Sequence, residues 1–225
     1  MNKKIDGIWG SKKYAVELTL TTPILGVSPM QESVWQAHMI KKMTDAAKKS
    51  GMSEEEIKAR IASDLADLKK RNEDGELVED ELNKGLTGFL KDETGYYIKD
   101  SQIKGFLKSA ASVLKQWGAM KQLGAKVRAN LYVTPLKIYL ADSAKELEIF
   151  ERPLRAQTPQ GERTCLARSE LIPEGTKISF TLESLLDVFP ENLLIGLFEF
   201  GKRQGLGQYR SGSYGQFVLS KFEQI

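Results

Sequence analysis

A glycine-rich run near the C-terminus carries the residue types best suited to binding chemistry. Residues 201–217 contain five glycines, and each glycine loses more backbone entropy on folding than any other residue. Such a density suits a loop that needs positive φ angles or a close approach of another backbone. Cations, amides, hydroxyls and one flat ring stand between the glycines: Lys202, Arg203, Gln208, Tyr209, Arg210, Ser211 and Ser213. Glycine N–H groups beside arginines form a cradle for phosphate oxygens.

Two questions about this run stay open at the level of the sequence. Glycine marks loops of every kind, so a purely structural turn is the alternative to a phosphate-binding loop. Tyr209 is suited either to stacking on an unpaired base, a contact worth roughly 1–3 kcal/mol, or to covering the core beneath the loop. A nucleotide P-loop is excluded, because no Gly-Lys-Ser/Thr sequence ends the run.

Catalytic and metal-binding side chains are scarce in this chain. His38 and Cys165 are its single histidine and single cysteine, so no zinc site can be assembled from soft ligands. We expect neither a metal nor a cofactor; a magnesium site made of carboxylates alone is the alternative, but no pair of carboxylates stands out. His38 has the chemistry of a general base for RNA cleavage through 2′-OH attack, but its helical context beside Met39 favours a surface or packing role. Cys165 has no histidine nearby with which to form a thiolate pair, so we expect a small buried apolar residue.

Composition sets broad limits on the class of protein. The chain has 225 residues, 41% of them hydrophobic, and a formal net charge of +3, so any basic surface must come from local clustering of cations. A single cysteine fits a reducing compartment. The sequence shows neither a signal-peptide pattern nor an apolar run of transmembrane length. We therefore expect a cytoplasmic protein with no membrane partner.

The hydrophobic periodicity predicts an α+β fold. Alternating apolar residues predict a strand over Tyr14–Thr21, and an apolar stripe predicts a helix that follows Asp100 as its N-cap. The apolar side of that helix comprises Ile103, Phe106, Leu107, Ala110, Val113 and Leu114. On another side, Lys104, Lys108 and Lys115 form a stripe, which is either a binding surface or only a solvated face of the helix. The remaining core elements are strands over Lys126–Leu140 (broken at Pro135) and Ile178–Leu182, a helix from Pro190 to about Arg203, and a last strand over Tyr214–Phe222. Their order is the ferredoxin-like/RRM-type β-α-β-β-α-β order.

Two segments lie outside this core, although we treat residues 1–225 as a single domain. Residues 33–92 are rich in charges, and their apolar residues recur at the spacing of one helical face, which predicts a helical insertion whose last helix extends to about Leu90. Residues 151–168 lie between short predicted strands over Leu147–Phe150 and Cys165–Leu171. Two prolines, a glycine and several arginines make this segment too polar for a core, so we predict an extended hairpin arm.

Four segments together resemble the RAMP superfamily, the RNA-binding proteins of CRISPR-associated effector complexes. They are Leu18–Gly26, Tyr97–Ala110, Glu170–Thr176 and the glycine-rich run itself. The second segment is similar to the family's strand-to-helix turn, in which a serine precedes a Lys-Gly pair and a further lysine. The resemblance is closest to the backbone subunits of type III complexes, and it covers the chain except for the helical insertion.

This resemblance implies a non-catalytic subunit that binds a guide RNA across the ferredoxin-like core and stacks as a homo-oligomer along it. The partners implied are guide RNA, a complementary nucleic-acid target and other effector subunits, in antiviral defence. The hairpin arm would contact the RNA held by a neighbouring subunit. The RNA-binding residues that we predict are Ser101, Gln102, Lys104, Lys108, Arg152, Arg155, Arg163, Arg168, Lys202, Arg203, Gly205, Gly207, Gln208, Tyr209, Arg210, Ser211 and Gly212.

The chain departs from the family at the position of catalysis. Target-cutting backbone subunits carry an aspartate on a loop after the first strand, whereas Val27–Glu32 contains no aspartate here. We therefore expect no catalytic residue, although the sequence leaves enzymatic activity open. The alternative function is a metal-independent endoribonuclease that processes precursor guide RNA. A protein-interaction scaffold that binds no RNA is the third hypothesis. The scarcity of histidine favours the non-catalytic subunit over the ribonuclease.

Overall fold

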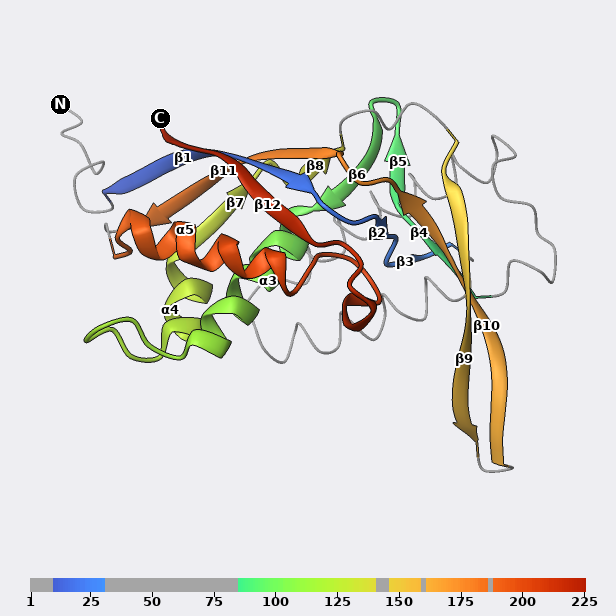
Figure 1. Cartoon of the computed structure of the whole chain (residues 1–225). Coiled ribbons are helices and arrows are strands. Elements are labelled where there is room, and N and C mark those ends of the chain that lie inside the picture. The colour runs from blue at the N-terminus through green and yellow to red at the C-terminus, as the bar shows by residue number, and fades with distance from the viewer. Residues whose placement is uncertain (1–9, 31–84, 141–145, 159–160, 186–187) are drawn as a thin grey trace, which may run out of the picture. The chain divides into compact units, whose positions relative to one another are not determined.

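The computed structural model describes residues 10–30, 85–140, 146–158, 161–185 and 188–225 (Figure 1). These residues belong to two compact units. The first unit comprises residues 1–24, 97–143 and 172–225, and the second comprises residues 25–96 and 144–171. Among the described residues, no helix combines the length and apolar character that a membrane crossing needs.

The first unit is built on a four-stranded antiparallel sheet. Its strands are β1 (Ser11–Leu20), β7 (Leu131–Thr134), β11 (Lys177–Leu185) and β12 (Phe217–Gln224), in the order β12-β1-β11-β7. β1 lies between β11 and β12, and its Val16 is opposite Phe180 on one side and Phe222 on the other. With α3 (Asp100–Leu114) after β1 and α5 (Glu191–Glu199) after β11, the chain follows the predicted β-α-β-β-α-β order. The predicted α+β, ferredoxin-like core is confirmed.

Alternating burial explains why β1 takes the central position. Tyr14, Val16, Leu18 and Leu20 are each at most 3% exposed, and the residues between them are not fully buried. Figure 1 shows α3 and α5 along the sheet. Aromatic side chains fill the space between the helices and the strands: Phe106 of α3 packs edge-on against Phe217 at 4.9 Å between centroids. Burial of each such side chain contributes about 1.5–3 kcal/mol.

One predicted core strand is partly wrong. Residues Leu123–Asn130 form α4, and the strand β7 begins only at Leu131. Leu123, Val127 and Leu131 are all fully buried and stand four residues apart, a spacing that places them on one side of a helix. After β7 and the cis Thr134–Pro135 peptide bond, β8 (Lys137–Tyr139) pairs with β6 (Gly95–Lys99).

The boundaries of the two core helices also differ from the prediction. Lys99 is the N-cap of α3, so Asp100 is the first helical residue and not the cap that the sequence predicts. Val113 and Leu114 are 61% and 42% exposed, and they are the last two residues of the helix, after the buried Ala110 and Ala111. Pro190 is the N-cap of α5, which ends at Glu199 and is followed by the 3₁₀ turn η3 (Phe200–Lys202).

The second unit contains a long antiparallel hairpin. β9 (Glu148–Thr158) pairs with β10 (Gly161–Ile172) from Glu148 opposite Leu171 to Thr158 opposite Gly161. These strands extend farther than the short strands predicted on either side of the arm. β10 also pairs in parallel with β4 (Leu86–Gly88), which in turn pairs with β3 (Ser28–Pro29).

The predicted helical insertion is wrong at its C-terminal end. Residues 86–88 form β4 and residues 90–92 form β5 (Leu90–Asp92). Gly88 lies against the side chain of the buried Glu170, whose Oε2 accepts a 2.8 Å hydrogen bond from the Phe89 N–H. These long-range contacts stabilise an extended backbone there. The part of the prediction that covers residues 33–84 lies outside the described residues.

Candidate nucleic-acid interface

The glycine-rich loop leads from α5 to β12 and is held in place by backbone hydrogen bonds. The Leu206 N–H donates to the Gly215 carbonyl at 2.8 Å, which closes the loop on itself. The Gly215 N–H donates to Pro23 O at 2.8 Å, and the Thr21 N–H donates to Gln216 O at 2.8 Å. The side chain of Leu206 is 3% exposed beneath the loop. The loop is therefore a rigid platform attached to the end of β1.

Close packing accounts for most of the glycines in this loop. A side chain on Gly205 would overlap the backbone of Gly215, and one on Gly215 would overlap the backbone of Leu206. Gly201 lies against the ring of Phe217, and Gly212 lies against the ring of Tyr209. The structural-turn alternative therefore explains why glycine occupies these four positions. Any phosphate affinity must come from the side chains that the loop displays.

Arg203 and Arg210 are the cations that the loop leaves available. Both are exposed, and neither guanidinium forms an ion pair within the described residues. Lys202 differs, because its Nζ is paired with the Glu199 carboxylate. Ser211 is exposed beside Arg210, whereas Gln208 and Gly207 are half-buried and Gly205 is buried. An arginine without a counter-charge is well suited to bidentate contact with phosphate.

Tyr209 packs against the loop itself. Its ring stacks on Tyr214, with centroids 5.6 Å apart and planes inclined by 27°, and it also contacts Gly212. It remains 41% exposed. One face of the ring is thus supported by the loop, and the exposed part of the side chain is accessible to a planar ligand.

Helix α3 contacts the loop through one of its sides. Ser109 Oγ donates a hydrogen bond to Gln204 Oε1 at 3.1 Å, and Phe106 packs near both Phe200 and Phe217. Gln102 precedes Ser109 by two helical turns and so lies on the same side. The structure therefore brings Gln102 of the predicted set onto the side of α3 that contacts the loop, while Ser101 is exposed at the start of the helix.

Lys104 and Lys108 lie on a different side of α3. Lys104 Nζ lies 4.4 Å from the centroid of the Tyr132 ring, and Lys108 faces α4. Burial of Lys104 lowers its pKa below the usual value of 10.5, while the nearby Asp100 acts in the opposite direction. The ammonium group of Lys104 is thus partly desolvated against an aromatic ring, which leaves it less accessible to a phosphate than a fully solvated lysine.

The predicted arginines of the arm belong to the hairpin of the second unit. Arg155 and Arg168 are on one face of the ribbon and Arg152 is on the other, because side chains alternate along a strand and cross-strand partners share a face. Arg168 Nε contacts Glu151 Oε1 at 2.6 Å. Arg163 is opposite Ala156 in β10, next to the tip of the hairpin. By their register, arginines therefore occupy positions on both faces of the ribbon.

Two cations that sequence reasoning missed line a pocket with Lys108 and Lys115. Lys121 precedes α4 and Arg128 lies within it. Interpretation of residues 126–140 as a strand concealed the helical spacing that would have placed these cations beside the lysine stripe of α3. His38 lies outside the described residues. Among the described residues, no group of three or more His, Cys, Asp or Glu side chains could hold a metal ion.

Comparison with known proteins identifies similarity at the level of the fold. No family model matches the sequence, and no curated protein matches it. Among solved structures, the chain is similar to a chain in the cryo-EM structure of the type III-B Cmr-beta complex bound to cognate target RNA, with a TM-score of 0.50 and 15% sequence identity. The match covers 96% of this chain and 61% of the other. This chain therefore spans less than two thirds of the length of that protein.

Proposed function

We propose that this chain is a non-catalytic RNA-binding backbone subunit of an RNA-guided effector ribonucleoprotein of the RAMP superfamily. The proposal rests on two exposed arginines, Arg203 and Arg210, on a rigid loop of a ferredoxin-like core. Neither of them forms an ion pair in the part of the chain that the structure describes. The fold shared with a chain of an RNA-bound Cmr-beta complex supports it. In this proposal guide RNA runs across the loop, and successive copies of the chain stack along it with a complementary target and other effector subunits.

Replacement of Arg203 and Arg210 by alanine is expected to weaken binding of single-stranded RNA at least tenfold. Each arginine would contribute a charge-assisted hydrogen bond to phosphate, worth about 1.5–3 kcal/mol. Loss of two phosphate contacts should also lower the slope of log K against log salt by about 1.4, at 0.7 per contact for a single strand. Fluorescence anisotropy across a salt series, with RNAs of unrelated sequence, measures both quantities.

The matched control is Lys177→Ala combined with Lys221→Ala. It removes the same two charges from the core sheet, where Lys177 is paired with Glu17 and Lys221 with Glu223. The control should retain most of the wild-type affinity and salt slope. Equal losses in the two double variants would mean that only net charge matters, and the loop would not be the RNA-binding site.

The protein assembled with guide RNA and a complementary target is expected to leave the target RNA intact. The described part of the segment after β1, from Val27 through β3 to Met30, contains no aspartate, the residue that target-cutting relatives carry there. Denaturing gel analysis of end-labelled target, with magnesium and without it, checks this expectation. Cleavage that disappears on a single substitution in this chain would contradict the non-catalytic proposal.

A further inference from the structure

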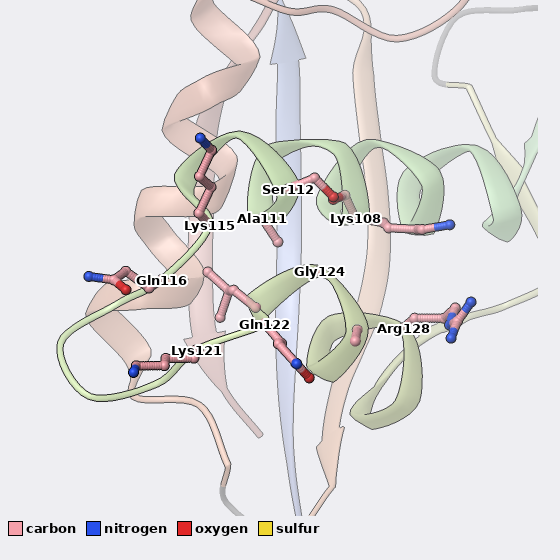
Figure 2. A pocket seen from close by; sticks show the side chains of 11 residues that line it. Lys108, Ala111, Ser112, Lys115, Gln116, Lys121, Gln122, Gly124 and Arg128 are labelled. Atoms are coloured by element: carbon pink, nitrogen blue, oxygen red, sulfur yellow. The ribbon is translucent and has the colours of Figure 1, made fainter.

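A second basic site lies in the first unit, between α3 and α4. The two helices border a pocket of about 580 Å³ (Figure 2), within the size range of ordinary ligand sites. Its base is apolar, because Ala111 and Leu123 are fully buried. Its wall carries the cations Lys108, Lys115, Lys121 and Arg128.

The close approach of the two helices gives the pocket a fixed shape. Gly124, in the first turn of α4, faces Ser112 of α3, and a Cβ on Gly124 would lie only 2.7 Å from Ser112 Oγ. Ser112 Oγ is oriented by a 2.8 Å hydrogen bond that it donates to the Lys108 carbonyl. The Leu123 N–H donates to Lys115 O at 3.2 Å, which joins the start of α4 to the end of α3. The pocket is therefore bounded by elements that are fixed to each other.

The charge of the pocket is unbalanced. No carboxylate lines it, and none of its four cations forms an ion pair within the described residues. Elsewhere in the first unit, Lys177, Lys202 and Lys221 each have a glutamate partner. Four like charges around one concave site repel each other, and a bound anion would relieve that repulsion. The N-terminal end of α4 adds partial positive charge at the same place.

The four cations divide into two groups. In Figure 2, Lys108 and Arg128 extend in the same direction at one end of the pocket, and Lys115 and Lys121 lie toward the opposite end. The hydroxyl of Ser112 and the amide of Gln122 lie along the pocket with them. Two separate cationic ends match a ligand with at least two phosphate groups better than they match a single inorganic ion.

An exposed aromatic residue follows the pocket in the chain. Trp117 is 38% exposed in a tight turn that is closed by two hydrogen bonds with Met120, and it comes directly after the lining residue Gln116. Val113 and Leu114 at the end of α3 are exposed as well. Proteins that bind single-stranded nucleic acid combine aromatic residues with cations, because bases stack on the ring while phosphates contact the cations. The sequence position of Trp117, one residue after the lining residue Gln116, supplies an exposed aromatic residue close to the cations in the chain.

We propose that the α3–α4 pocket is a second phosphate-binding site, occupied by consecutive backbone phosphates of a single-stranded RNA. The site goes beyond the proposed function and stands without it, because it lies on a different side of α3 from the contact between Ser109 and the glycine-rich loop. Free nucleoside polyphosphates share the same chemistry and are the other source of such phosphates. Trp117 and the two-ended arrangement of cations favour the strand.

Lys121→Ala combined with Arg128→Ala is expected to weaken binding of single-stranded RNA at least tenfold and to lower the salt slope by about 1.4. The matched control is Lys126→Ala combined with Lys13→Ala, which removes two cations outside the pocket, one of them from α4 itself. Equal losses in both double variants would overturn the proposal. Binding is measured on the full chain by the anisotropy of a labelled RNA of about 12 nucleotides, a length within the usual range of single-strand sites. Circular dichroism tests whether each variant is folded.

Competition distinguishes the sources of phosphate. ATP and an acidic peptide are titrated against labelled RNA on the wild type and on the Lys121→Ala/Arg128→Ala variant. Weak ATP binding with strong RNA binding supports the strand. Pocket-dependent binding of ATP or the peptide, with RNA affinity unchanged by the variant, overturns it. The Arg203→Ala/Arg210→Ala variant in the same assay separates the two sites. If this loop variant loses RNA affinity and the pocket variant does not, only the second site is contradicted. If the pocket variant loses RNA affinity and the loop variant does not, only the loop site is contradicted.

Crosslinking provides a test that needs no variant. The wild-type protein is irradiated with RNA that contains 4-thiouridine, and crosslinked peptides are mapped by mass spectrometry. Crosslinks within residues 113–128, with Trp117 among them, are the expected result. Crosslinks confined to the glycine-rich loop or to the hairpin arm would overturn the second site.

Discussion

A chain with a shortened arm is expected to bind RNA as a folded monomer and to lose length-dependent assembly. The sharpest design replaces residues 156–163 by Asn-Gly. Arg155 and Thr164 are cross-strand partners, and a two-residue Asn-Gly turn joins such a pair with the correct strand twist. The remaining register from Glu148 opposite Leu171 to Arg155 opposite Thr164 is left unchanged, and so are the contacts between β10 and β4.

Under the proposed function, assembly should be lost because each copy would contribute few contacts to RNA by itself. Stacking along one strand makes each binding event after the first nearly intramolecular, and a contact to the neighbour's RNA is what links the events. The arm is suited to that contact, since it carries arginines on both faces and includes Pro153 and Pro159, which lower the entropy lost on ordering. Sedimentation velocity on RNAs of increasing length measures particle size directly.

The full-length Arg163→Ala variant separates the length of the arm from its charge. If the length of the arm is decisive, the Arg163→Ala variant still forms particles that grow with RNA length, and only the variant with the shortened arm does not. If both variants fail, the charge at position 163 is what links the subunits. Ordered growth of the shortened variant in step with RNA length would show that the arm is not the intersubunit contact.

The sequence predicts the core of this fold because the buried positions there are apolar at regular intervals along the chain. From Tyr14 to Leu20 in β1 and from Ile178 to Leu182 in β11, every second residue is apolar and buried, and Leu18 and Ile178 are both fully buried. The same reasoning fails at α4, because Leu123, Val127 and Leu131 fit a helix, whereas the apolar residues from Leu131 onward fit a strand. Only the long-range pairing of Leu131 with Ser184 fixes the boundary between the two.

The candidate site is less predictable from the sequence than the core. The glycine-rich run predicts a loop and its cations, but not that Lys202 is paired with Glu199 while Arg203 and Arg210 have no ion pair within the described residues. A helical projection groups Lys104 with Lys108, yet Lys104 lies on the ring of Tyr132, which is distant in sequence. Ion pairs and ring contacts depend on residues that only the folded chain brings together, so no local pattern reveals them.

Three glycine-to-alanine variants in the first unit are expected to differ in stability, and Gly215→Ala is expected to be the least stable of them. Gly215 has a φ of +72°, and an added Cβ would overlap the Leu206 backbone. Left-handed strain costs roughly 1–2 kcal/mol and overpacking about 1–3 kcal/mol, so the sum is about 2–5 kcal/mol. At roughly 2–4 °C per kcal/mol for a chain of this size, the melting temperature should fall by about 4 °C or more.

Two other glycines separate backbone strain from overpacking as the cause of the lost stability. Gly175 has a φ of +81° with open space around its Cβ position, and Gly196 lies inside α5 with open space and an ordinary φ. Gly175→Ala should therefore cost only the strain, about 1–2 kcal/mol, and Gly196→Ala should stabilise the protein by up to about 1 kcal/mol, because alanine is the better helix former. Differential scanning fluorimetry ranks the three variants. A Gly215→Ala variant as stable as Gly175→Ala would mean that the loop relaxes around the new side chain, and the rigid platform inferred for Arg203 and Arg210 would be wrong.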